Sequence, residues 1–294
     1  MSDPGNAYQS LADSVEHDDP RWAFGTGVED VAAEITAPIP DGVAADDLAE
    51  YCLALGDDAL ICSHRLTEWV SNAPELEEEV ALANIALDLL GQARVLLARA
   101  GHVAGKGEDE LAFWRSEAQF RNVAMAELPD DLDFGHAIAR LLLFATWRLA
   151  LLHRLLDSRD PVLAAVAGKG VKELAYHRDY AARWTLRLGD GTDESHRRMQ
   201  AGLDAVWPYH DELFRTSDVE RRLPGVAVDP AQLRAEVDAV LDDVLRTATL
   251  TRPDVPPMGP LGGRGGRQGA HTEHLGPVLA VLQSLARQHP GATW

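Results

Sequence analysis

The sequence is short of cysteine and of basic residues, and each shortage excludes a class of protein. Its 27 lysines and arginines stand against 47 acidic residues, which gives a net charge of -20. Nucleic acids and anionic membrane surfaces repel such a chain, so we expect neither as a partner. The two cysteines, Cys52 and Cys62, lie about 15 Å apart if they share a helix, which is beyond disulfide reach. We expect both to be reduced thiols in the core.

Membrane-spanning and targeting signals are also lacking. No apolar run approaches the roughly 20 residues that cross a bilayer. Residues 1–19 are acidic and polar, without the basic and apolar regions of a signal peptide. These features favour a cytoplasmic protein. The 294 residues, 46% hydrophobic and 25% charged, are sufficient for a substantial folded core.

Alternating β-branched stretches are absent from the sequence, while helical periodicity runs through most of it. Residues 1–45 are predicted to form a disordered or loosely docked N-terminal tail, in which Trp22 and Phe24 serve as an anchor. Residues 46–294 are predicted to form a single all-α domain, a helical bundle with additional C-terminal helices. The long helices are expected at 46–71, 74–101, 130–157 and 160–188, and the shorter ones at 193–215, 229–248 and 271–288.

The predicted helix 74–101 carries a polar stripe inside an otherwise apolar sequence. Asn84, Asp88 and Gln92 recur every four residues and therefore share one face. A helix that is apolar on nearly every side is buried on nearly every side, and a buried carboxylate needs a charged or hydrogen-bonding partner. The other long helices offer partners at similar depth. The predicted helix 46–71 offers Asp57, His64, Arg65 and Glu68. The predicted helix 130–157 offers His136 and Arg140, and the predicted helix 160–188 offers Lys172, Glu173, Tyr176, His177 and Tyr180.

Inward-facing polar groups from four helices are the layout of carboxylate-bridged di-iron proteins, but the ligand set is incomplete. Such a site takes a Glu from each of two helices and a Glu-x-x-His from each of the other two. Gly91 stands where a His would follow Asp88, and Leu174 stands where a Glu would precede His177. The predicted helix 130–157 has no carboxylate between Phe134 and Leu156. Degenerate di-iron positions remain at Glu68, Asp88, Glu173 and His177.

We therefore expect no metal and no catalytic residue in this chain, and a structural polar core in the volume of the site. The predicted members of that core are Asn84, Gln92, Arg65, His136, Arg140 and Lys172. Cations can replace the charge of a metal opposite a carboxylate. Asp88 is accordingly expected to be deeply buried and paired with Arg65, Arg140 or Lys172.

Three further motifs favour plain structural interpretations. His271 and His274 are three residues apart, whereas zinc proteases space such a pair by four with Glu second, so capping or an interface role is favoured over zinc. The Gly-rich segment 262–267 lacks the preceding strand and the Lys-Ser/Thr ending of a phosphate-binding loop and is interpreted as a flexible loop. The segment 196–198 (HRR) either forms a solvated face or touches a phosphate-bearing ligand or a partner's carboxylates.

Several segments between about residue 50 and the C-terminus carry a family resemblance. The longest are Ala81–Arg94 (ALANIALDLLGQAR), Lys172–His177 (KELAYH), Arg187–Gln200 (RLGDGTDESHRRMQ) and Gly269–Gly276 (GAHTEHLG). The shorter ones are Asp57–Leu60, Glu68–Trp69, Ala73–Glu78, Phe120–Asn122, Thr249–Pro253 and Pro290–Trp294. Together, in this order, they resemble the C subunits of phenylacetyl-CoA epoxidases.

The resemblance implies a ferritin-like fold and a non-catalytic structural subunit of the multicomponent 1,2-phenylacetyl-CoA epoxidase. One implied partner is a homologous di-iron catalytic subunit, which inserts an oxygen atom of dioxygen into the aromatic ring during aerobic phenylacetate breakdown. Another is a reductase that supplies electrons from NADPH through flavin and iron–sulfur groups. No cofactor is implied for this chain itself. Two other interpretations stay open: a di-iron oxygenase or ferroxidase acting alone, and a helical interaction protein unrelated to oxygenation.

Overall fold

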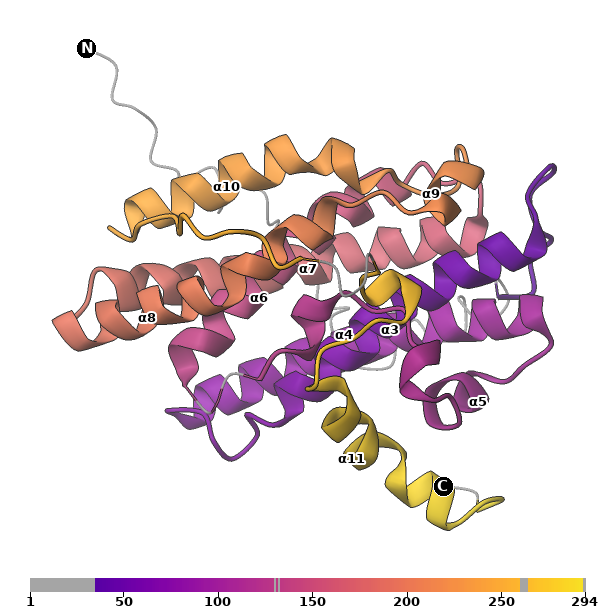
Figure 1. Cartoon of the computed structure of the whole chain (residues 1–294), viewed down its shortest axis with the longest axis horizontal. Coiled ribbons are helices and arrows are strands. Elements are labelled where there is room, and N and C mark those ends of the chain that lie inside the picture. Colours follow the sequence, from indigo (N-terminus) through magenta and orange to yellow (C-terminus); the bar gives the residue numbers. More distant parts are fainter. Residues whose placement is uncertain (1–34, 130, 132, 260–263, 293–294) are drawn as a thin grey trace.

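Four long helices form the body of the protein in the computed structural model, which describes residues 35–129, 131, 133–259 and 264–292 (Figure 1). These helices are α3 (Ala45–Thr67), α4 (Leu76–Ala104), α6 (Phe134–Leu155) and α7 (Pro161–Gly189). α3 packs along α4, α6 packs along α7, and α4 also contacts α7. No β-strand occurs in the described residues, so the predicted all-α bundle is confirmed.

Local sequence signals explain where the long helices begin and end. Glu77, Glu78 and Glu79 lie in the first turn of α4, where negative charge complements the helix dipole. α4 is followed by the capping residue Gly105, which adopts the left-handed conformation that glycine tolerates best. At the start of α7, the Asp160 side chain accepts hydrogen bonds from two backbone amides, and Pro161 occupies the first turn.

The C-terminal part of the chain adds shorter helices around this body. α8 (Asp193–Val206) packs along α6 and α7, and α10 (Arg234–Thr247) contacts the same two helices. α11 (Leu275–Gln288) projects from the bundle near α5 (Glu108–Phe113) and α3 (Figure 1). The predicted additional C-terminal helices are therefore confirmed.

Some expected boundaries and elements differ from the observed ones. The single helix expected at 193–215 is wrong, because α8 ends at Val206 and a 3-10 helix, η4 (Trp207–Phe214), follows. Pro208 lies at this junction, where its ring and missing amide hydrogen prevent an α-helix from continuing. The short elements were not expected from the sequence. They are α5, α9 (Asp218–Arg222), and the 3-10 turns η2 (Glu117–Gln119), η3 (Ala124–Glu127) and η6 (Gly266–Gln268). The helix expected at 229–248 is observed as the 3-10 turn η5 (Pro230–Leu233) followed by α10.

Both cysteines are buried and free, which confirms the expectation of core thiols. Burial raises the pKa of the Cys52 thiol, so this side chain stays protonated at neutral pH. By length and composition, two helices in the described part of the chain are apolar enough to cross a membrane, contrary to the expectation that no segment approaches this length. The apolar window of α6 is 89% buried in the bundle, as in a core helix, whereas that of α4 is 44% buried.

The predicted N-terminal tail is only partly described. Residues 1–34, which include Trp22 and Phe24, lie outside the described residues, so their expected anchoring stays a prediction. Within the described part, Ile39 and Val43 pack against the core. Arg99 of α4 donates hydrogen bonds to the backbone carbonyls of Ile35 and Ala37, at 2.9 and 2.6 Å. Residues 35–44 therefore lie against the bundle.

Candidate functional site

Three of the four degenerate di-iron positions come together between α4 and α7. His177 Nε2 lies 3.0 Å from Asp88 Oδ2, and Gln92 Nε2 donates to Glu173 Oε2 at 2.8 Å. The fourth position, Glu68, follows the C-terminal end of α3, where its exposed carboxylate pairs with Arg65 at 2.9 Å.

Arg148 reaches the same place from α6. Its side chain is fully buried, and its Nε donates to Gln92 Oε1 at 3.0 Å. The Gln92 amide therefore bridges the Arg148 guanidinium and the Glu173 carboxylate. We call the group Asp88, Gln92, Arg148, Glu173 and His177 the α4–α7 cluster. Arg148 is not among the core residues predicted from the sequence, although an arginine inside the apolar run 137–152 is a visible signal of a buried polar contact.

Burial and neighbouring charge set the electrostatics of the α4–α7 cluster. Burial raises the pKa of the Glu173 carboxyl, the Gln92 hydrogen bond opposes that rise, and the Asp88 carboxylate adds to it. Burial also lowers the pKa of Arg148, which Asp58 opposes. A guanidinium nevertheless keeps its proton in proteins, so Arg148 places a positive charge at the inner end of the cluster.

The donors of the α4–α7 cluster do not fit a di-iron centre. No group of three or more His, Cys, Asp or Glu side chains gathers in a metal-binding arrangement among the described residues. His177 Nδ1 is buried without a hydrogen-bond partner in the described part, but one imidazole nitrogen is far from a ligand set. The Arg148 charge beside Gln92 opposes a further cation there.

Two expectations about Asp88 are wrong. Its side chain is 35% exposed rather than deeply buried, and its partner is His177 rather than Arg65, Arg140 or Lys172. The reason is that the outer side of α4 is not covered by another helix of the described chain, so Asp88 lies at the edge of the bundle. Lys172 is exposed on α7 and does not belong to a polar core, which corrects its assignment.

The other predicted core residues are distributed over the bundle. Gln92, Arg65 and Arg140 are buried, whereas Asn84 and His136 are half-buried. Arg65 does not approach the α4–α7 cluster through its hydrogen bonds. Its Nε donates to the carbonyl of Glu127 at 2.9 Å, and its Nη2 donates to that of His274 at 3.3 Å. Arg65 therefore fixes backbone from two distant segments to α3.

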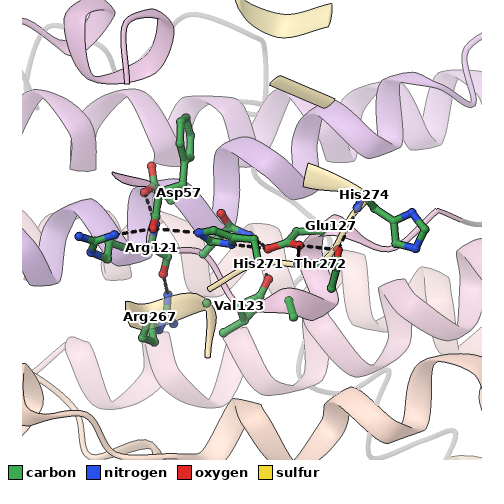
Figure 2. Close-up of polar contacts among 12 residues, drawn as sticks. Asp57, Arg121, Val123, Glu127, Arg267, His271, Thr272 and His274 are labelled. Carbon is green, nitrogen blue, oxygen red and sulfur yellow. Dashed lines mark hydrogen bonds and ion pairs between the residues drawn. The ribbon is translucent and has the colours of Figure 1, made fainter. Parts of the chain in front are cut away.

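A larger buried network surrounds α3, and of its members Asp57 was expected as an inward-facing polar group. Asp57 accepts two hydrogen bonds from Arg115 and one from the Arg121 amide at 2.8 Å. Its neighbour Asp58 accepts from Arg267 at 2.7 and 2.8 Å and from the Val123 amide. Both carboxylates are fully buried. We call these contacts, together with those of Glu127, the carboxylate network (Figure 2). The adjacent acids in the apolar run LALGDDALIC were its visible signal.

Glu127 connects the C-terminal segment to this network. Its buried carboxylate accepts from Asn122 Nδ2 at 2.8 Å and from the Thr272 amide and hydroxyl at 2.8 and 2.6 Å. His271 Nδ1 lies 2.6 Å from the same carboxylate, and Figure 2 shows the imidazole directed at it. Burial lowers the pKa of His271, but the Glu127 contacts outweigh burial and raise it above its ordinary value.

The observed contacts show what the three remaining sequence motifs do in the structure. His271 engages Glu127 and the Phe120 carbonyl, while His274 contributes its backbone, so the two rings serve different roles. The expectation of a flexible loop is wrong at Arg267, which is held by Asp58. In the segment 196–198, Arg197 and Arg198 form exposed ion pairs with Glu194, as on a solvated face.

Comparison with known proteins adds a family to this geometry. A family model described as phenylacetic acid catabolic protein matches residues 31–294. The chain is also 45% identical over 252 residues to the C subunit of the 1,2-phenylacetyl-CoA epoxidase of Escherichia coli (strain K12). That match covers 85% of this chain and 100% of the relative. The family match and the all-helical architecture agree with the ferritin-like bundle that the resemblance implies.

Proposed function

This chain belongs to the family of phenylacetic acid catabolic proteins, and we propose that it is the non-catalytic structural subunit of a cytoplasmic 1,2-phenylacetyl-CoA epoxidase. A role in phenylacetate catabolism follows from the family and from the named relative. The finer proposal is that the chain supports a homologous di-iron subunit, which carries the chemistry. Electrons reach that subunit from NADPH through a flavin and iron–sulfur reductase.

The non-catalytic assignment rests on one observation, the hydrogen bonding within the α4–α7 cluster. Asp88 and Glu173 are hydrogen-bonded to His177 and Gln92, and the Arg148 charge lies within the same group. Lys169 also pairs with Glu173 at 3.4 Å, so the charge that compensates this acid comes from the protein without a metal. We therefore propose that the cluster maintains the α4–α7 packing and binds no iron pair.

The test measures iron and turnover separately. The purified chain, reconstituted aerobically with ferrous iron, is expected to hold no stoichiometric metal. Phenylacetyl-CoA epoxidation is expected only when the homologous subunit and the reductase are both added. A pair of irons per chain, or turnover by this chain with reductase alone, would show a stand-alone oxygenase instead. Failure to co-purify with the homologous subunit from the native host would favour an unrelated interaction protein.

The variant Glu173→Gln sharpens this test. It keeps the shape of the side chain and its hydrogen-bonding capacity toward Gln92, but it removes a carboxylate that a metal or a proton transfer would need. We expect the assembled complex to keep its turnover rate. A normally assembled complex that is inactive would overturn the structural assignment of the α4–α7 cluster.

A further inference from the structure

The outer side of α4 exposes a regular row of apolar side chains. Leu76, Val80, Leu87 and Leu90 are 70%, 53%, 40% and 36% exposed, and the half-buried Ala83 lies between them. We call these five residues the α4 seam. Successive members are separated by four, three, four and three residues, which is the spacing with which one helix packs along another. The seam extends about 21 Å along α4.

Charge is almost absent from this part of α4. Between Glu79 and Arg94 the sole charged residue is Asp88, which lies beside the seam and is satisfied by His177. In a chain with 25% charged residues, a solvated helix face carries more charge than this. Contiguous exposed apolar surface with a polar rim is typical of a protein interface.

We propose that the α4 seam is the surface on which a long helix of the homologous subunit packs, an inference that rests on the proposed function. The occupant is expected to present an apolar row with the same three–four spacing, flanked by basic or uncharged residues. The half-exposed carboxylate of Asp88 is positioned to accept a hydrogen bond from such a flanking side chain.

Charge complementarity distinguishes this occupant from a second copy of the same chain. Glu75, Glu77 and Glu79 surround the N-terminal end of the seam. Arg94 at the other end already pairs with Glu108 at 3.0 Å. A second copy would bring further acidic ends against this face, and the two arginines of α7 beside Glu78 are already engaged. Arg183 pairs with Asp179, and Arg187 lies over the Trp184 ring. The net charge of -20 equally disfavours an anionic membrane surface.

The experiment measures binding of the purified homologous subunit by sedimentation and calorimetry. Leu87→Glu places a charge near the middle of the seam and is expected to weaken binding at least about 30-fold, as at an interface hot spot. Leu156→Glu is the matched control, because Leu156 is similarly exposed (44%) but lies at the end of α6. The control is expected to bind as the unmodified chain does.

Leu76→Glu guards against a folding artefact. Leu76 is the first residue of α4 and is largely exposed, and a Glu there favours the helix dipole, so the variant is expected to melt as the unmodified chain does and still bind more weakly. Unchanged binding by both seam variants would overturn the seam but leave the proposed function intact. If the unmodified chain does not bind the subunit at all, the proposed function and the seam's occupant both fail. Self-association or binding to phosphatidylglycerol vesicles that Leu87→Glu abolishes would also overturn the proposed occupant.

Discussion

At the scale of single residues, Asp88 and Asp160 show how differently two acids of one bundle are held. Asp88 lies at the edge of the bundle, and its partner is the imidazole of His177, which is charged only when it is protonated. Asp160 is fully buried, pairs with the fully buried Arg99 at 2.6 Å, and caps α7 through two backbone amides. The cost of losing either acid depends on how much of its partner's charge is left buried in the protein.

We predict that Asp88→Ala lowers the free energy of unfolding by about 1–3 kcal/mol, because the carboxylate is partly solvated but its loss leaves Nε2 of the buried His177 without its hydrogen-bond partner. Asp160→Ala is the contrasting variant and is expected to cost about 3–5 kcal/mol, since it strands Arg99. Urea denaturation of both variants measures the difference. Equal losses would mean that Asp88 is much more deeply engaged than its exposure indicates.

The geometry of a helix explains which site residues the sequence could reveal. Four residues advance a helix by roughly 40° more than one full turn. The stripe Asn84, Asp88 and Gln92 therefore winds from the outer side of α4 toward the core, and only its last member is buried. Spacing predicts that residues share a face, but it does not predict what covers that face. The same limit explains why the prediction of Lys172 as a core residue is wrong.

At the scale of elements, the C-terminal segment is attached to the bundle by ionisable contacts. Arg267 pairs with Asp58 of α3, and His271 pairs with Glu127 of η3. Only the second contact depends on protonation near neutral pH. Since Glu127 raises the pKa of His271, the folded protein favours the protonated imidazole more than the unfolded chain does.

We predict that the stabilisation contributed by His271 is full below the ordinary histidine pKa of about 6.5 and is lost as pH rises through the higher folded value. The difference in unfolding free energy between the unmodified chain and His271→Asn should therefore shrink as pH rises above the ordinary histidine pKa of about 6.5. Urea denaturation at several pH values measures it. The difference is used because the lowered pKa values of His64, His153 and His210 act in the opposite direction. A difference that grows with pH would show that the folded state holds a neutral His271.

Long helices could be predicted from the sequence and short ones could not. α3, α4, α6 and α7 have apolar periodicity over many turns, with Asp160 and Pro161 marking one boundary. α5 and α9 have too few residues for a period to appear. The 3-10 turns η3 and η6 are held by distant partners, such as Asp58 and Glu212, rather than by local preference. A single sequence carries no local record of such contacts.

At the scale of the whole molecule, the charge of -20 opposes compaction. The ion pairs Arg99–Asp160, Arg115–Asp57 and Arg267–Asp58 have largely or fully buried side chains and are little affected by salt. Salt does screen the repulsion among the exposed acidic side chains. The balance between these buried ion pairs and the surface repulsion predicts how the stability of the protein responds to ionic strength.

We predict that the melting temperature rises when NaCl is increased from about 0.01 M to about 0.3 M, because screening reduces the repulsion among surface carboxylates. Scanning calorimetry measures the shift, and the same rise in KCl would exclude an effect specific to sodium. A melting temperature that falls with salt would mean that exposed ion pairs such as Arg154–Glu236 contribute more than the repulsion removes.

The face that we propose as the docking surface could not be predicted from sequence patterns. Leu87 and Leu89 are two residues apart on α4, yet Leu89 is buried inside the chain and Leu87 is exposed. An apolar residue looks the same in the sequence whether its own chain or another chain covers it. Periodicity and composition therefore predicted a helix buried on every side, and only the packing of the bundle shows which side is left open.

The pairing of Asp58 with Arg267 also limits when α3 can reach its final packing during synthesis of the chain. The two residues are separated by 209 positions. At translation rates of 5–20 residues per second, the aspartate is made roughly 10–40 s before its counter-ion exists. A carboxylate is costly to bury alone, so α3 cannot settle into its final surroundings on the ribosome during that interval. Until Arg267 has been synthesised, the part of the nascent chain that contains α3 stays solvated or bound to a chaperone.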